Sequence, residues 1–492
     1  MMKKYIYMLM AVCAFSSCTD FLDKSPLSEY TDQDLGNKDE NSGPSYTTAE
    51  DAEDLLKGCY QEFRSEYFIL DRYVLQEVMS GNCYVGSNGA SENQIENFAI
   101  EATNSIVERD WRYLYGFVSK TNIILKYVPL IEDPALTPTR KNEILAEASF
   151  CRAYAYFDLV RYFGDVPLIL DVLPSINSDN IDEVYPLIYP YRAPKEDVYE
   201  QIYKDLDFAL KNARDFDQDK NIITKGTVRT LLAKYYATLE DKDWNKINSL
   251  CDEILPSYPM VQNYADLFDD HHKNSSEAIL EIYYDGNKSN GTENWGGWIF
   301  VGWDWKRYNV PSVSLVKEFG PTDTRKDASF LFADVTNMWG DKYWTDLTKF
   351  PFSYKFKDYT NGTSDAILLR AADVKLLKAE AQLEMGNVSD AWGIVNEIRG
   401  RAGAELLPDA DKNNTTAVKN YIIRERRLEL ALEGCFWFDL LRMGEAINYI
   451  SNVQDADGNY IYRGKINDNR LILPIPQSER MLNKNLTQNP GY

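Results

Sequence analysis

Apolar residues that recur at helical spacing in two distant segments most constrain the fold of this chain. In the first segment they fall three and four positions apart, as Val228, Leu231, Leu232, Tyr235 and Leu239 and then, after a polar break, as Ile247, Leu250, Cys251 and Ile254. Residues at this spacing share one face of an α-helix and are buried together. The segment therefore predicts a helix hairpin.

A second helix hairpin is predicted nearer the carboxyl terminus, with Gly386 and Asn387 at its turn. Its two apolar stripes are Leu369, Ala372, Leu376, Ala379 and Leu383, followed by Ala391, Ile394, Val395, Ile398 and Ala402. Small Ala381 and Ala391 beside the turn resemble a tetratricopeptide helix pair, in which small side chains let two helices approach closely. We expect a mainly α fold whose scaffold is a stack of tetratricopeptide-like helix pairs.

A segment of different character, roughly residues 258–363, interrupts the scaffold: helical periodicity fades there, and Gly, Asn, Asp, Trp and Tyr accumulate. Residues 278–284 are typical of a strand, and residues 343–359 alternate polar and aromatic side chains like short strands or a hairpin. We expect one body over residues 49–492, helical over about 49–257 and 364–492, with this irregular insert between. Long irregular segments usually carry function, so ligand contacts are expected in the insert.

Residues 294–308 of the insert contain four of the ten tryptophans of the chain. The candidates for ligand contact are Trp295, Trp298, Trp303, Trp305 and Tyr308. Neighbouring glycines are expected to prevent a stable helix, so that the rings cannot all be buried along one stripe. A flat indole covers the C–H face of a sugar ring, while polar neighbours bind its hydroxyls. The cluster indicates glycan binding, and the alternative, that the rings pack the loop onto the scaffold, stays open.

Two other loops are candidate parts of the ligand surface. In the first, residues 81–89, Tyr84 is the expected aromatic platform. The second and weaker set is Trp339, Tyr343 and Trp344.

The amino-terminal residues predict export and a lipid anchor. Residues 1–17 have two lysines followed by an apolar run too short to span a bilayer, as in a signal peptide. They end in small residues before Cys18, which resembles a bacterial lipobox, so we expect Cys18 to be acylated and residues 18–48 to form a polar tether. The alternative is a plain secretory peptide with an incidental cysteine.

Charge and cysteine usage exclude several classes of partner and framework. The formal net charge is -23, with 53 basic and 76 acidic residues. Polyanions such as nucleic acid are repelled at long range by such a chain, and a neutral ligand is mildly favoured, although solubility alone explains the charge. The five cysteines after Cys18 include no C-x-x-C pair, so no disulfide framework is expected.

Four motifs in a fixed order resemble the SusD-like (RagB/SusD) family of lipoproteins. They are AEASFCRAYAYFDLVRYFGDVPLI at 146–169, LRAADV at 369–374 with AEA at 379–381, NEIRGRAG at 396–403, and ERRLELALEG at 425–434 with WFDL at 437–440; the chain then ends in LPIP and QNPGY. The resemblance implies a largely helical lipoprotein on the outer face of the outer membrane. It further implies a glycan or other nutrient ligand and a SusC-like TonB-dependent transporter, over whose mouth the protein sits as a lid.

The motifs themselves are interpreted as structural. In the first, Phe150, Ala153, Tyr154, Phe157 and Val160 form an apolar stripe. In the last, Leu428, Ala431, Leu432 and Cys435 form the stripe, and the charges of residues 425–433 are expected in helix-surface or packing ion pairs in preference to a ligand clamp. Ligand-contacting loops differ between members of the family, so no binding residue is transferred from it.

Enzymatic residues are scarce, so we expect no catalysis, no cofactor and no metal. His271 and His272 are the only histidines, and the sequence has no G-x-S-x-G, Walker A, strand-linked G-x-G-x-x-G or EF-hand spacing. A glycoside hydrolase needs only two carboxylates and stays open as an alternative. So does a non-catalytic assembly or interaction lipoprotein.

Overall fold

The computed structural model describes residues 46–173, 180–301 and 306–492. The expected signal peptide, Cys18 and nearly all of the tether lie outside the described residues. Among the residues described, no helix is both long and apolar enough to cross a bilayer. The helices are α2 (Ala49–Gln61), α3 (Ala90–Glu96), α4 (Ser105–Tyr127), α5 (Pro138–Phe163), α6 (Ile181–Ile188), α7 (Lys195–Asn212), α8 (Lys225–Thr238), α9 (Trp244–Ile254), α10 (Gly296–Val301), α11 (Val313–Glu318), α12 (Arg325–Ser329), α13 (Ala371–Glu384), α14 (Val388–Arg401), α15 (Thr415–Glu429), α16 (Phe436–Arg442), α17 (Ala446–Ser451) and α18 (Gln477–Leu482).

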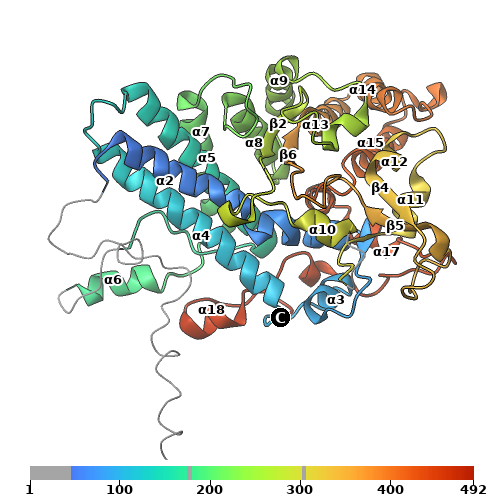
Figure 1. The fold of residues 1–492 in the computed structure, drawn as a ribbon, viewed down its shortest axis with the longest axis horizontal. Helices are drawn as coiled ribbons and strands as arrows, with labels where there is room; N and C mark the ends of the chain where they lie inside the picture. Colours follow the sequence, from blue (N-terminus) through green and yellow to red (C-terminus); the bar gives the residue numbers. More distant parts are fainter. Residues whose placement is uncertain (1–45, 174–179, 302–305) are drawn as a thin grey trace, which may run out of the picture.

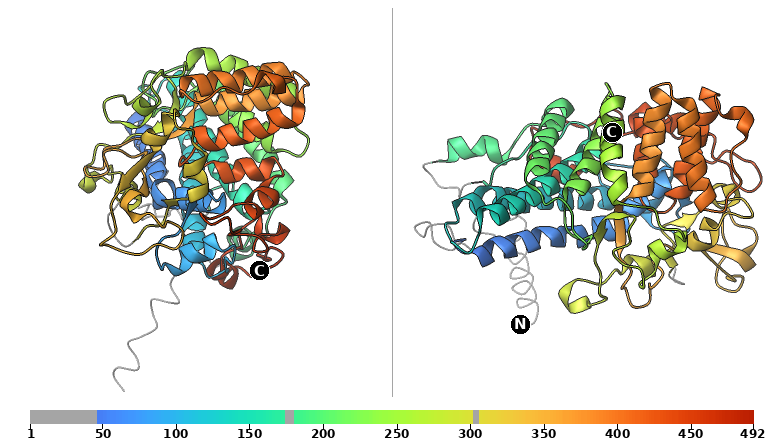
Figure 2. Two further views of the ribbon diagram at one scale, coloured as in Figure 1. Left: turned by 90° about the vertical axis from the view of Figure 1, so that its right-hand side faces the viewer. Right: turned by 90° about the horizontal axis from the view of Figure 1, so that it is seen from above.

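The helices form one continuous stack, which confirms the predicted mainly α scaffold (Figure 1). Helix α2 packs on α4, α4 on α5, α5 on α7, α7 on α8 and α8 on α9; α9 then contacts α13, which packs against α14 and α15. In the view from above, the green and orange helices of this stack stand side by side (Figure 2, right). The two predicted hairpins are therefore neighbours in space, joined through α9 and α13.

Both hairpins form where the periodicity predicts them, because each stripe is buried and each turn has suitable capping residues. In α8 and α9, Thr224 and Asp243 cap the amino termini with their side-chain oxygens. In α13 and α14, Gly386 adopts φ +87° at the turn, a left-handed conformation that glycine reaches without strain. The buried stripes are those predicted, with three exceptions. Leu239 follows the last residue of α8, Ile394 is half-buried, and Leu369 is buried but lies in a β-strand (Ala366–Arg370) that precedes α13.

Helix α5, which carries the first motif, runs through the centre of the molecule. Every residue from Ala146 to Val160 is buried, so the expected single apolar stripe was too narrow a prediction. The polar side chains on the other faces have partners: Arg152 donates to both Asp205 oxygens at 2.8 and 2.7 Å, and the Tyr67 hydroxyl donates to Asp158 at 2.6 Å. The helix ends at Gly164, which has φ +70°.

The fourth motif supplies a buried charge network, so its charges lie in packing ion pairs. Glu429 accepts hydrogen bonds from Arg370 at 2.7 Å and Arg325 at 2.9 Å and also pairs with Arg401. Glu425 binds Arg325 at 2.6 Å. The predicted apolar stripe does not continue along one helix, because α15 ends at Glu429 and Leu432 takes a positive φ of 65°. The arginines surrounding Glu429 hold the pKa of its carboxyl well below its usual range, although burial opposes this.

The insert contributes at least one strand to each of three antiparallel pairs, and the yellow to gold segments gather on one side of the helices (Figure 2, right). The predicted strand at 278–284 is β2 (Ala278–Ile282), which pairs with β6 (Ala366–Arg370) at the start of α13. The prediction for residues 343–359 is only partly right. That segment contains β5 (Phe350–Ser353), whose partner is β4 (Phe330–Ala333), outside the segment. The remaining pair is β1 (Cys83–Tyr84) with β3 (Val310–Pro311).

Candidate functional site

The candidate ligand surface is a row of three aromatic residues in the insert, here called the aromatic rim: Trp298 in α10, and Tyr354 and Tyr359 in the segment after β5. Trp298 has 47% of its surface exposed, while Ile299, Phe300 and Val301 of the same helix are buried. The helix therefore places its apolar face in the core and its indole outside.

Helix α10 begins with two glycines, in a segment where the sequence predicted no helix. A Cβ on Gly296 would lie 2.3 Å from the main-chain oxygen of Ile69, and one on Gly297 would lie 2.9 Å from Cβ of Phe356. Both positions require glycine because the backbone of α10 packs directly on its neighbours. The expectation that glycines prevent a helix was wrong because tertiary contacts outweigh the propensity cost of about 1 kcal/mol per glycine.

The rings of the aromatic rim follow one another at contact distances. The Trp298 and Tyr359 centroids are 6.4 Å apart with the planes tilted by 39°, and those of Tyr359 and Tyr354 are 6.5 Å apart at 69°. Tyr354 and Tyr359 are half-buried. Successive rings at such spacing, one exposed and two half-buried, can contact successive apolar faces of a carbohydrate chain.

Polar side chains suitable for sugar hydroxyls lie beside the aromatic rim. Thr360 and Asn361 are exposed in the turn after Tyr359, and the Asn361 amide donates to Asp358 at 2.9 Å. Lys357 lies with its Nζ 5.7 Å from the Tyr354 ring centroid, and burial lowers the pKa of this lysine. The turn is joined to the segment just before α10, because the backbone N–H of Asn294 donates to the Gly362 carbonyl oxygen at 2.8 Å.

The other described members of the predicted main cluster differ from Tyr354 and Tyr359 in the core that they contact, because the two tyrosines border a smaller cluster that includes Phe350 and Phe352. Trp295 and Tyr308 are half-buried and pack against the principal hydrophobic core. Trp303 and Trp305 lie outside the described residues. Tyr354 and Tyr359 were not singled out in the sequence, and the only signal for them is the polar and aromatic alternation of residues 343–359.

Tyr84 is not an exposed platform, which corrects the prediction for residues 81–89. Its side chain is 1% exposed, and its hydroxyl donates to Asp341 at 2.6 Å. The loop is buried because β1 pairs with β3 and because Asn82 accepts a hydrogen bond from Arg427 at 2.8 Å. The Tyr84 ring packs edge-on against Tyr343, at 4.8 Å between centroids.

The weaker set, Trp339, Tyr343 and Trp344, mainly packs the insert. Trp339 meets the Phe350 ring edge-on at 6.0 Å, and the Trp344 indole donates to the Pro311 carbonyl at 3.0 Å. Trp344 nevertheless borders an open groove of about 490 Å³, together with Phe332 and several lysines and aspartates. This groove is a second surface that a polar ligand could occupy.

His272 belongs to a surface cluster with Asp266 and Asp269, whose ligand atoms are close enough to hold a cation. His272 Nδ1 lies 2.8 Å from Asp269, and this contact raises the pKa of the imidazole. The cluster is explained by that ion pair alone.

Two family models match this chain in succession. Residues 274–492 match the SusD family, and residues 20–236 match a family described as starch-binding and associating with the outer membrane. SusD-like protein P2 of Formosa agariphila is 26% identical, with 100% of both chains covered. A SusD-like protein of Bacteroides ovatus is 24% identical over 97% of this chain and 92% of its own.

Solved structures share the fold. A SusD superfamily protein from Parabacteroides distasonis superposes with a TM-score of 0.75 at 24% identity, covering 91% of this chain and 100% of its own. A laminarin-binding SusD-like protein gives 0.73 at 23% identity, over 91% and 100% of the two chains. Surface glycan-binding protein A from Bacteroides uniformis gives 0.73 at 20%, over 90% and 99%. The two family models together span most of the chain, and with the helix stack and its four ordered motifs they show that it belongs to the SusD-like family.

Proposed function

We propose that this protein captures a nutrient oligosaccharide at the cell surface and delivers it to a SusC-like TonB-dependent transporter, without acting on it chemically. The observation that carries the proposal is the exposed indole of Trp298, held outward by a helix whose buried residues Ile299 and Phe300 belong to the principal hydrophobic core. Trp298 and Tyr359 are proposed as stacking platforms, and Thr360 and Asn361 as partners for hydroxyls.

The relatives support a glycan as the ligand class. One structural neighbour is described as laminarin-binding and another as a surface glycan-binding protein. The net charge of -23 favours a neutral polysaccharide over an acidic one. Laminarin, a neutral glucan, is therefore the first probe to use, followed by other neutral polysaccharides.

Binding is tested by affinity electrophoresis and calorimetry on soluble protein lacking residues 1–18. Removing the ring by Trp298→Ala is expected to weaken binding about ten-fold or more, because loss of one stacking platform costs about 1–2 kcal/mol. The matched control is Tyr203→Ala, which removes an exposed ring of α7 in the helical scaffold and should leave binding unchanged. Equal losses in both variants would contradict the proposed surface.

The alternatives predict different products from the same samples. A glycoside hydrolase releases reducing ends during incubation with the bound polysaccharide, whereas a capture protein leaves them constant. An assembly lipoprotein binds none of the panel and releases nothing. Accumulating reducing ends, lost on mutation of a carboxylate near the bound sugar, would replace the capture proposal.

Anchoring and delivery need the whole cell. We expect radiolabelled palmitate to be incorporated into the wild-type chain and not into the Cys18→Ala variant. The variant should also be absent from the outer membrane fraction. The anchored protein is expected to copurify with a SusC-like transporter. Normal growth on the glycan after deletion of this chain, with the transporter intact, would contradict the delivery role.

A further inference from the structure

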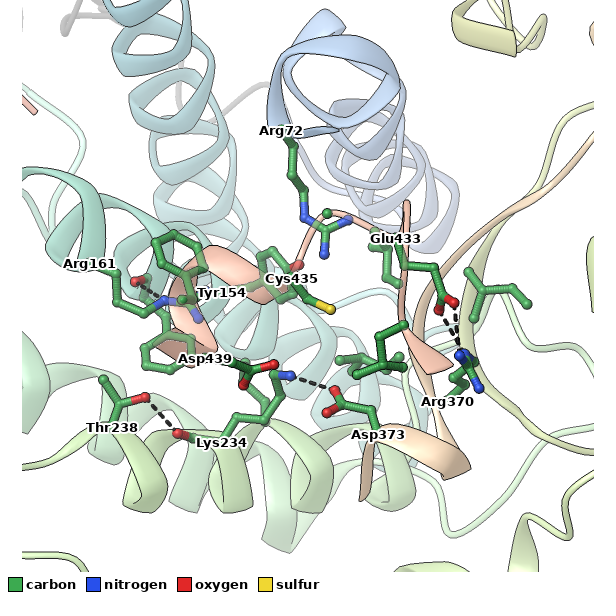
Figure 3. A pocket seen from close by; sticks show the side chains of 18 of the residues that line it. Arg72, Tyr154, Arg161, Lys234, Thr238, Arg370, Asp373, Glu433, Cys435 and Asp439 are labelled. Atoms are coloured by element: carbon green, nitrogen blue, oxygen red, sulfur yellow. Dashed lines mark hydrogen bonds and ion pairs between the residues drawn. The ribbon is translucent and has the colours of Figure 1, made fainter. Parts of the chain in front are cut away.

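A small cavity, more enclosed than the groove beside Trp344, lies at the junction of α5, α8, β6 and the segment from Leu430 to Arg442 (Figure 3). Its volume is about 40 Å³. A water molecule needs roughly 10–15 Å³ measured in this way, so the cavity has room for a few waters or one small ion and not for a sugar ring.

The acidic side chains of the cavity wall are already paired. Asp373 binds Lys234 and Arg426, Glu433 binds Arg370 and Lys355, and Asp439 binds Arg426 and Arg442. Figure 3 shows the Glu433 carboxylate directed at Arg370, with two contacts between them. None of these carboxylates is left over to neutralise another cation.

Arg161 is also satisfied. It forms an ion pair with Asp158, and its guanidinium lies between the Phe157 and Phe438 rings, at 3.8 and 3.7 Å from their centroids.

Arg72 is the exception among the charged residues of the wall. It lies between the two π-helical segments Tyr67–Asp71 and Val74–Val78, and it is only 6% exposed. Its guanidinium has no ion pair within the described residues, and its enclosed Nη1 has no hydrogen-bond partner there. Figure 3 shows the side chain reaching toward the Cys435 sulfur, with Tyr154 on one side and Glu433 on the other.

A buried guanidinium that has no ion pair is costly, because the Asp158 carboxylate offsets its desolvation only from beyond ion-pair distance. Arginine cannot escape that cost by losing its proton. We propose that the cavity is a site for a small monovalent anion of halide size, with Arg72 as its principal ligand. The anion neutralises the charge of Arg72 and accepts hydrogen bonds from its N–H groups. It thereby links the amino-terminal π-helical segments to the Gly434–Cys435 turn.

The surrounding backbone is shaped to leave this space open. Gly434 has φ +68°, and a Cβ there would lie 3.3 Å from the Tyr73 ring and 3.5 Å from both Cγ and Nη1 of Arg72. A side chain at Gly434 would be strained by this φ and would crowd the Tyr73 ring, while its Cβ would touch Arg72 at ordinary van der Waals distance.

The test measures thermal unfolding of the full chain in chloride and in gluconate at equal ionic strength, since gluconate is too large for the cavity. A bound anion raises the Tm of the wild type in chloride by roughly 2 °C or more, saturably. Arg72→Met keeps the bulk of the side chain and should lose the difference. The control Arg463→Met removes an exposed arginine stacked on Tyr460 and should retain it.

A crystal of the wild type grown in bromide gives a readout that does not depend on the variant folding. The proposal predicts an anomalous peak within hydrogen-bond distance of the Arg72 guanidinium. Equal Tm values in chloride and gluconate, or bromide peaks only on the outer surface, would overturn it in favour of waters around Arg72. Neither result bears on glycan binding, which is measured separately.

Discussion

Among single residues, aromatic side chains of the insert and its neighbours have opposite environments. Trp298 exposes its indole, whereas Tyr84 is enclosed with its hydroxyl on Asp341. Both positions were candidates in the sequence, since each lies near glycine in a segment without helical periodicity. Whether such a ring is exposed depends on strands and carboxylates from segments far away in the sequence. The residues next to the ring therefore do not predict its exposure.

Glu479 gives a prediction about pH at the same scale. Burial and the nearby Glu108 carboxylate raise its pKa to about 7. Because the folded value exceeds the unfolded one, its stabilising contribution is complete below about pH 4.5 and is lost as pH rises through 7. We expect Glu479→Gln to raise the Tm at pH 8, with a gain of about 1–2 kcal/mol in the free energy of unfolding. At pH 5 it should change the Tm little.

The measurement is a series of thermal unfolding curves from pH 5 to 8. Glu240→Gln, at an exposed position, is the control and should follow the wild type throughout. If the wild type and Glu479→Gln have parallel profiles, Glu479 is not the group that titrates near neutrality.

Among the elements, the helix hairpins could be predicted and α10 could not. The apolar stripes of α8, α9, α13 and α14 repeat at helical spacing because one face of each helix is buried. The pattern can therefore be recognised within each segment of the sequence alone. The backbone of helix α10 closely approaches the Ile69 main chain and the Phe356 side chain, which lie far away in the sequence. Its glycines therefore looked like helix breakers when they are close-packing positions.

The close packing of α10 predicts that Gly296→Ala displaces the helix. The added Cβ meets a main-chain oxygen, so we expect a loss of about 2–3 kcal/mol in unfolding free energy and weaker glycan binding, because Trp298 moves with the helix. Gly393→Ala in α14 meets no atom within 4 Å and should be neutral or stabilising by about 0.5–1 kcal/mol. Urea denaturation measures both, and an unchanged Gly296→Ala would show that α10 tolerates the contact.

In the whole molecule, buried ion pairs join segments that the sequence keeps apart. Glu429 of α15 meets Arg370 of β6, Arg401 of α14 and Arg325 of α12. The sequence predicted ion pairs in this motif but not their depth, because a charged stretch usually marks a solvated helix face. The stack and the insert are thus connected through charge as well as through apolar contact.

Breaking this network should destabilise the entire fold. Glu429→Gln leaves several buried arginines short of a counter-charge, and we expect a loss of about 3–5 kcal/mol in unfolding free energy by urea denaturation. Glu397→Gln breaks the solvent-exposed pair with Lys375 and should cost less than about 1 kcal/mol. Comparable small losses in both variants would mean that the network contributes little.

The most direct test of glycan capture is a crystal structure with the oligosaccharide that binds best in the panel. We predict a sugar ring stacked on the Trp298 indole, with Tyr359 beside it and hydroxyls within hydrogen-bond distance of Thr360 or Asn361. An oligosaccharide bound in the groove beside Trp344, with Trp298 untouched, would contradict it.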